Sequence, residues 1–194
     1  MLRAVPGAAS RSADRRCLLL LWACVTLACG GPRPASPPDI LWIVLDAAAA
    51  SELGLFGGEG PTPHLERFAE EAVVFERAYA QGPQTTLSVS SFLTGRYPPS
   101  AWVERRLRGP TLAEHLRDGG YGTVGFSENP WVFEGFGFAR GFSEFTIGEV
   151  PNAVGFGADQ TLRYAAERIL EERDHPLLTY IHLLPPHSPY HPPA

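Results

Sequence analysis

Hydroxyl side chains crowd the segment 82–98, where an expected strand gives way to an expected helix. Thr85 stands just before the expected helix 86–93. The N-terminus of a helix carries unpaired N–H groups and a partial positive charge, so it favours the oxygens of a phosphate or sulfate group. A hydroxyl at that place can attack a bound ester once a metal ion lowers its pKa. Thr85 is therefore the candidate nucleophile, and Ser88 is a candidate substrate-binding residue. Helix capping, the commoner role of such hydroxyls, stays open as the alternative.

Two further polar residues follow expected strands. Asp46 closes the apolar run 40–45, and a carboxylate there suits a hard divalent cation, which takes oxygen ligands. Capping of the next turn is the alternative role for Asp46. Asn129 follows the apolar run 121–126, and we expect it to contact the substrate.

The candidate histidine is His187, which lies in a Pro-rich loop after the run 177–183. An imidazole in that place can bind an oxyanion or protonate a leaving group, although a lone loop histidine is more often only a surface residue. We expect His182, inside the run itself, to be partly buried with its hydrogen bonds satisfied rather than to act as a ligand.

Strand-like and helix-like segments alternate from residue 39 onward. Continuous apolar runs predict strands, and apolar residues at helical spacing with capping signals predict helices. The expected strands are 40–45, 73–78, 121–126 and 177–183, and the expected helices are 62–72, 86–93, 111–119 and 159–173. This alternation predicts an α/β fold with a mostly parallel sheet flanked by helices. Because ligands bind beyond the carboxyl ends of strands in such sheets, we expect the polar residues that follow the four strands to converge there; these are Asp46, Thr85, Asn129 and His187.

Five segments resemble, in order and spacing, the N-terminal part of sulfatase-like hydrolases of the alkaline phosphatase superfamily. The segments are 43–57, 62–69, 92–98, 112–123 and 180–193. The resemblance implies the fold of that superfamily and a divalent metal ion (Ca, Mg, Mn or Zn). It also implies a sulfate or phosphate ester as substrate, carried on a small molecule, a glycan or a lipid.

The nucleophile segment departs from most sulfatases. Its first residue is Thr85, where the family carries a Cys or Ser that is oxidised to formylglycine, and Leu87 and Val89 stand in place of Pro and Arg. The second Asp of the first metal motif is replaced by Ala47. With these changes, the sequence resembles the superfamily members that have a threonine nucleophile, which include phosphoethanolamine transferases. That resemblance implies Asp46 and Thr85 as ligands of one metal ion.

The resemblance leaves several functions open. The C-terminal metal motif of the family, an Asp followed by Asn or His and then Gly, has no counterpart in the sequence. We therefore expect the chain to be the N-terminal part only of such a domain, with little or no esterase activity by itself. The alternatives are a catalytically degenerate binding module, which the alanine run 47–50 favours, a phosphoethanolamine-type transferase, and an anchored protein of unrelated α/β fold.

Composition and the N-terminus bear on partners and location. The net charge is −5 and the pI is near 5.7, so the chain lacks the basic footprint of a nucleic-acid-binding protein. Residues 1–29 combine an arginine-rich start with an apolar run too short for a membrane span, as in a secretory signal peptide. Cys29 ends a segment that looks like a bacterial lipobox, which would lipidate it; ordinary cleavage nearby is the alternative. We expect 30–38 to be a Pro-rich linker and 39–194 to be the exported domain, periplasmic or at the cell surface.

Overall fold

The structure is a computed structural model that describes residues 37–148 and 158–188. The predicted signal peptide 1–29, the lipidation site Cys29 and nearly all of the predicted linker 30–38 lie outside the described residues. They stay predictions.

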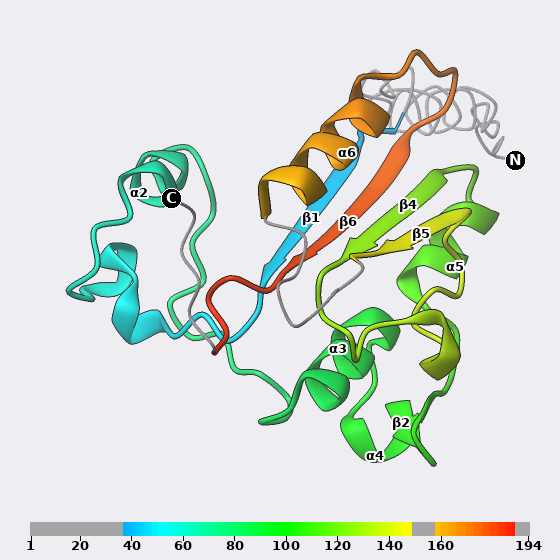
Figure 1. The fold of residues 1–194 in the computed structure, drawn as a ribbon, viewed down its shortest axis with the longest axis horizontal. Helices are drawn as coiled ribbons and strands as arrows, with labels where there is room; N and C mark the ends of the chain where they lie inside the picture. Colours follow the sequence, from blue (N-terminus) through cyan, green and yellow to red (C-terminus); the bar gives the residue numbers. More distant parts are fainter. Residues whose placement is uncertain (1–36, 149–157, 189–194) are drawn as a thin grey trace, which may run out of the picture. The chain divides into compact units, whose positions relative to one another are not determined.

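One four-stranded sheet organises the described chain (Figure 1). Its strands lie in the order β1 (Ile40–Leu45), β6 (Leu177–Leu183), β4 (Gly122–Ser127) and β5 (Glu144–Ile147), and every neighbouring pair is parallel. The predicted α/β fold with a mostly parallel sheet is confirmed. β6 lies between β1 and β4, so the residues that follow β1 and β4 emerge on either side of the end of β6.

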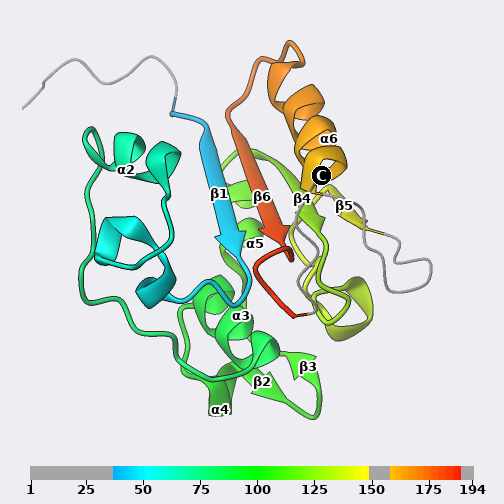
Figure 2. The same ribbon diagram turned by 60° about the vertical axis from the view of Figure 1, so that its left-hand side comes forward.

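Helices cover both faces of the sheet (Figure 2). On one face, α3 (Thr85–Thr94) contributes Val89 and Leu93 to a cluster that includes Tyr180 of β6. On the other face, α6 (Ala158–Leu170) packs Ala165 against Ile181 of β6. Side chains alternate across a strand, so a strand covered on both faces is largely apolar, and β6 could be predicted from its sequence although it contains Thr179 and His182.

The edge strand β1 is covered unevenly. Trp42 and Val44 pack against the α3-side cluster, whereas Leu41, Ile43 and Leu45 are 55%, 46% and 37% exposed. α6 therefore shields β6 and β4 but leaves the outer face of β1 open.

Local signals explain the remaining helices. α5 (Leu112–Asp118) begins with a complete capping box, in which Thr111 and Glu114 bind each other's backbone N–H groups. α2 (Pro63–Ala69) has proline at its first position, as predicted, and ends earlier than the predicted helix 62–72. The other short elements are η1 (Ala50–Glu52), η2 (Gly54–Phe56), α4 (Pro98–Ala101), the strands β2 (Trp102–Val103) and β3 (Arg106–Leu107) of a hairpin, and η3 (Glu134–Phe136).

The predicted strand 73–78 is wrong. The structure has no strand in this described segment, and Val73 and Phe75 are 82% and 75% exposed. An apolar run becomes a strand only where a neighbouring strand can pair with it and a packed layer can cover it. Neither lies beside this segment in the described chain, so its apolar pattern was misleading.

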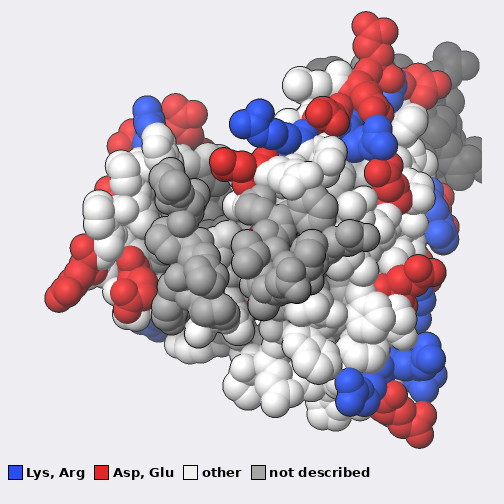
Figure 3. All heavy atoms as spheres, viewed as in Figure 1, with Lys and Arg blue, Asp and Glu red and all other residues white. Residues whose placement is uncertain are grey.

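Charged side chains of both signs lie on the described surface. On the face in Figure 3, acidic and basic side chains are interspersed, and the described residues form no continuous basic area there. Among the helices of residues 37–148 and 158–188, none is both long and apolar enough to cross a membrane.

Candidate active site

The candidate site forms where β1, β4 and β6 end and α3 begins. The backbone N–H of Asp46 donates to the carbonyl of Leu183 at 2.9 Å, and the N–H of Glu128 donates to the carbonyl of His182 at 2.9 Å. These bonds continue the two ladders one residue past the strands. As a result, Asp46 and Asn129 approach each other across the end of β6.

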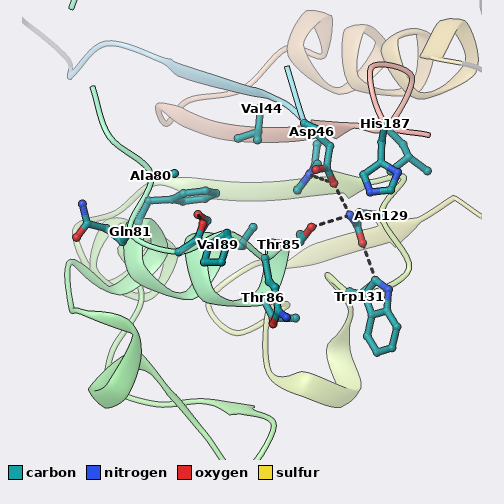
Figure 4. A pocket seen from close by; sticks show the side chains of 18 of the residues that line it. Val44, Asp46, Ala80, Gln81, Thr85, Thr86, Val89, Asn129, Trp131 and His187 are labelled. Carbon is teal, nitrogen blue, oxygen red and sulfur yellow. Dashed lines mark hydrogen bonds and ion pairs between the residues drawn. The ribbon is translucent and has the colours of Figure 1, made fainter. Parts of the chain in front are cut away.

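Asn129 joins the parts of the site. Its Nδ2 group donates to Oδ2 of Asp46 and lies 3.4 Å from Oγ1 of Thr85. The orientation of the amide follows from its other end, because Oδ1 accepts the backbone N–H of Trp131 at 2.8 Å and must therefore be the oxygen. Asn129 is 2% exposed, so its NH₂ group is held toward Asp46 and Thr85 (Figure 4).

Asp46 has a second partner in His182. His182 is 1% exposed, its Nε2 lies 3.1 Å from Oδ2 of Asp46, and its Nδ1 lies 3.0 Å from the hydroxyl of Tyr180. Burial raises the pKa of Tyr180, and the nearby charge of Asp46 raises it further, so the phenol stays protonated and donates to Nδ1. The hydrogen-bond network thus assigns the proton of a neutral His182 to Nε2, from which it is donated to Asp46.

The Asp46 carboxylate is stabilised in its charged form. Burial raises the pKa of this carboxyl, but the hydrogen bonds from His182 and Asn129 lower it more, and the nearby His187 lowers it further. The net pKa lies below its usual value of 3.8. Asp46 is therefore an anion at neutral pH, as a metal ligand must be.

Thr85 is the first residue of α3, and the N-cap is Gln84, whose side chain makes no capping hydrogen bond. The N-terminus of the helix is therefore not closed by a side chain of its own. In Figure 4 the Thr85 side chain points toward Asn129, and the Thr86 side chain points away from Asp46. Of the two adjacent threonines, only Thr85 faces Asn129, and its role as the nucleophile stays a prediction.

Ser88 and His187 lie in the same cleft as Asp46 but are engaged differently. The Ser88 hydroxyl donates to the carbonyl of Gly82 at 2.9 Å, so it holds the loop before α3. His187 follows a tight turn in which its N–H donates to Leu184 at 2.7 Å, and its Nδ1 contacts the carbonyl of Ser188. The substrate-binding role of Ser88 and the catalytic role of His187 stay predictions.

The loop that carries His187 is anchored by a buried carboxylate. Oε2 of Glu128, a residue only 2% exposed, accepts the backbone N–H of Leu184 at 2.8 Å. Glu128 thereby ties the end of β4 to the start of this loop, and it fixes where the loop leaves the sheet.

One cleft of about 1150 Å³ is lined by Asp46, Thr85, Ser88, Asn129, His182 and His187. Its other wall is aromatic and basic, and sequence reasoning missed that wall. The residues of this wall are Trp102, Arg105, Trp131 and Phe136. They lie in the β2–β3 hairpin and in the segment after β4, far from Thr85 in sequence, and no local pattern marked them. The contact of His182 with Asp46 was also missed, although it follows from the pairing of Val44 with His182 in the sheet.

The oxygen donors fit a hard divalent cation in type but supply only part of a coordination sphere. Asp46 offers a carboxylate and Thr85 a hydroxyl, and such cations take six or more oxygen ligands. Within residues 37–148 and 158–188, no group of three or more His, Cys, Asp or Glu side chains is placed to hold a metal ion. Asp46 and Thr85 can therefore provide two ligands of such an ion, with water or other groups providing the rest.

The fold resembles that of solved proteins of the alkaline phosphatase superfamily. The structure of BT4656 in complex with its substrate D-glucosamine-2-N,6-O-disulfate matches with a TM-score of 0.67 and 19% identity, over 80% of this chain and 36% of that one. A superfamily protein from Vibrio parahaemolyticus matches at 0.66 and 22%, over 83% and 43%. The periplasmic domain of the phosphoethanolamine transferase EptC from Campylobacter jejuni matches at 0.60 and 15%, over 81% and 50%. At these identities the likeness shows the fold alone.

Sequence comparison identifies the family of the chain. The Sulfatase family model matches residues 38–194, so the chain belongs to the sulfatase family. Mouse steryl-sulfatase is 44% identical over 70 residues, which are 36% of this chain and 11% of that enzyme. N-acetylgalactosamine-6-sulfatase of the dog is 37% identical over 84 residues, 43% of this chain and 16% of the enzyme. The chain thus spans only a small part of these relatives, and membership supports a hydrolase at the level of the family.

Proposed function

We propose that this chain carries the nucleophile end of a metal-dependent, sulfatase-like hydrolase of sulfate or phosphate esters. The observation that carries the proposal is the position of Thr85. Its hydroxyl stands at the open N-terminus of α3 and lies 3.4 Å from the Asn129 amide, which also holds Asp46. An anionic ester group at the helix N-terminus would lie directly in front of this hydroxyl.

The chemistry is nucleophilic displacement at sulfur or phosphorus. Oγ1 of Thr85 releases its proton to solvent and forms a bond to the central atom while the bond to the departing alcohol oxygen breaks, and His187 gives that oxygen a proton. Water or a second alcohol then takes the group from Thr85. A divalent cation bound by Asp46 and Thr85 would lower the pKa of the hydroxyl and neutralise charge on the ester. Asn129 and His182 keep Asp46 in place during these steps.

The proposed substrate class is supported by the relatives. Steryl-sulfatase, N-acetylgalactosamine-6-sulfatase and the disulfated glucosamine substrate of BT4656 support a sulfated glycan or sterol as the substrate of this chain. The glucosamine disulfate is therefore a useful test ligand.

The proposal includes export of the protein, with an anchor at a lipidated Cys29. Cell fractionation of wild type and Cys29→Ala tests the anchor, and equal release of both proteins into the soluble fraction would count against it.

The test of the nucleophile is covalent labelling. The full chain is incubated with 4-nitrophenyl sulfate or 4-nitrophenyl phosphate, each with Ca²⁺, Mg²⁺, Mn²⁺ or Zn²⁺. Because we expect the chain by itself to have little or no esterase turnover, the expected result is a single stoichiometric release of nitrophenolate, with the mass of one sulfuryl or phosphoryl group on Thr85. Thr85→Ala abolishes both signals, whereas Thr86→Ala is the matched control and keeps them. Labelling elsewhere, or unchanged release by Thr85→Ala, contradicts the assignment.

Two alternatives keep specific support. The amide of Asn129 donates to the oxygens of Asp46 and Thr85, the same atoms that would bind a cation, and this favours a non-catalytic binding module. Under that alternative no cation changes the thermal stability of the chain. The fold of EptC supports a transferase, which would pass the labelled group to an added alcohol faster than to water.

A further inference from the structure

The positively charged side chain of Arg105 lies in the wall of the cleft opposite Asp46 and pairs with no acidic residue of the described chain. Arg105 lines the cleft and is exposed, and no carboxylate in residues 37–148 and 158–188 forms a salt bridge with it. Its guanidinium lies 5.3 Å from the ring centre of Phe136 and 5.9 Å from that of Trp131. The two rings orient the guanidinium by cation–π contact, and its N–H groups donate to no residue in the described part of the chain.

The aromatic floor beneath this cation is built, and one ring stays accessible. Trp131 and Phe136 stack with an interplanar angle of 12°, and Trp102 meets Phe136 edge-on at 82° and stacks on Phe138. Phe138 is fully buried, whereas Trp131 remains 53% exposed. Trp131 is therefore held by neighbours and still presents apolar surface to the cleft. Its backbone N–H is the group that fixes the Asn129 amide, so the floor adjoins the nucleophile (Figure 4).

The backbone that presents Arg105 is strained. Val103 pairs with Arg106, which leaves Glu104 and Arg105 as a two-residue hairpin turn with φ values of 51° and 59°. Such a turn favours Asn and Gly, because side chains with a Cβ rarely adopt positive φ. An arginine kept at a position that favours glycine is a reason to look for a role of its side chain.

We propose that Arg105 and Trp131 form a second subsite, which binds an additional anionic group on a sugar ester whose first anionic group lies at Thr85. Arg105 pairs with the oxygens of a sulfate, phosphate or carboxylate, for which its planar fork of donors is suited. Trp131 takes the apolar face of the sugar ring. This inference rests on the proposed function, since it assigns the substrate class of the same cleft: a sugar with two anionic groups rather than a singly charged aryl or sterol ester.

The test is equilibrium binding to the full chain in the Thr85→Ala background, measured by calorimetry. The two probes are D-glucosamine-2-N,6-O-disulfate and N-acetyl-D-glucosamine 6-sulfate, which differ chiefly in the second anionic group. We expect the disulfate to bind roughly tenfold or more tightly, as one good charge-assisted pair provides. Arg105→Gln removes this preference, and Trp131→Leu weakens both sugars. The matched control Arg106→Gln removes the same charge from the same hairpin and keeps the preference.

Every outcome decides the inference. Equal affinities for the two sugars, no binding of either, or a preference that survives in Arg105→Gln would overturn it. These results do not depend on turnover. Labelling of Thr85 by 4-nitrophenyl sulfate without a disulfate preference refutes the subsite and leaves the hydrolase proposal intact. If the disulfate preference depends on Arg105 but Thr85 is never labelled, the subsite is supported and the hydrolase proposal is refuted.

Discussion

The side-chain amide of Asn129 donates to the carboxylate of Asp46, although the two residues are 83 positions apart in the sequence. The contact exists because β6 lies between β1 and β4, so the residues that follow these two strands reach each other across its end. One buried amide thus connects the candidate metal ligand to the candidate nucleophile, and the site depends on the order of the strands.

Removing this amide is expected to destabilise the fold. Asn129→Ala takes a donor from a charged carboxylate and leaves the backbone N–H of Trp131 without its acceptor. Losses of this kind cost about 2–3 kcal/mol of unfolding free energy. Urea denaturation, followed by both fluorescence and circular dichroism, measures the difference. Gln160→Ala on the surface of α6 is the control and is expected to change stability by less than about 0.5 kcal/mol. A similarly small effect of Asn129→Ala would show that the contact contributes little.

Sequence reasoning found the parts of the site that depend on topology alone. Because β1 is a continuous apolar run and β6 is largely apolar, their positions were predicted to within a residue, and Asp46 was placed correctly at a strand end. The hydroxyl segment was assigned to a helix start, and α3 begins one residue earlier than predicted, at Thr85.

The missed features depend on contacts that no local pattern encodes. β5 has four residues and each strand of the hairpin has two, too few for a period to be recognised. Arg105 and Trp131 meet only because the hairpin folds onto the segment after β4. Conversely, the run 73–78 has the composition of a strand but lacks a neighbour in the described chain, so composition was not sufficient there.

The stability of the chain is expected to fall in acid through Glu114. Burial raises the pKa of this carboxyl, but its hydrogen bond to the Thr111 backbone and the charge of Arg140 lower it more, so the net pKa lies below its usual 4.5. A carboxyl whose pKa is lower in the folded protein than in the unfolded chain stabilises the fold at pH values above its unfolded pKa. This contribution disappears as the pH falls through the folded pKa. Glu114→Gln keeps the acceptor of the capping box but not the charge.

The measurement is the free energy of unfolding of both proteins between neutral pH and about pH 3. We expect wild type to be more stable by about 0.5–1 kcal/mol at neutral pH, as for a partly exposed ion pair, and the difference to vanish at the acid end. A difference that stays constant over this range would exclude the charge as its source.

Relief of the hairpin strain is expected to stabilise the protein. Glu104 has a φ of 51°, is exposed and makes only a 3.4 Å surface salt bridge to Arg108. Glu104→Gly removes the conflict between Cβ and the backbone but increases the freedom of the unfolded chain, so the net gain is about 0.5–1 kcal/mol. Glu104→Val, with a β-branched side chain at the same φ, is expected to lower the melting temperature. Thermal denaturation compares the three proteins, and a loss of stability in Glu104→Gly would mean that the turn is not strained.

A second carboxylate beside Asp46 is expected to strengthen divalent-metal binding. Ala47 lines the cleft and has a φ of 56°, a conformation that Asp adopts more readily than Ala. It also stands where most sulfatases carry the second Asp of their first metal motif. Ala47→Asp therefore adds an oxygen ligand without opposing the backbone, and it adds a charge that repels Asp46 when no cation is present. We expect the variant to be less stable than wild type in chelator and to gain more melting temperature from Ca²⁺ or Mg²⁺. Ala47→Asn is the matched control: it tolerates the same φ without adding charge, and its response should resemble that of wild type. If Ala47→Asp and Ala47→Asn respond to the cation equally, Asp46 and Thr85 do not form part of a metal site.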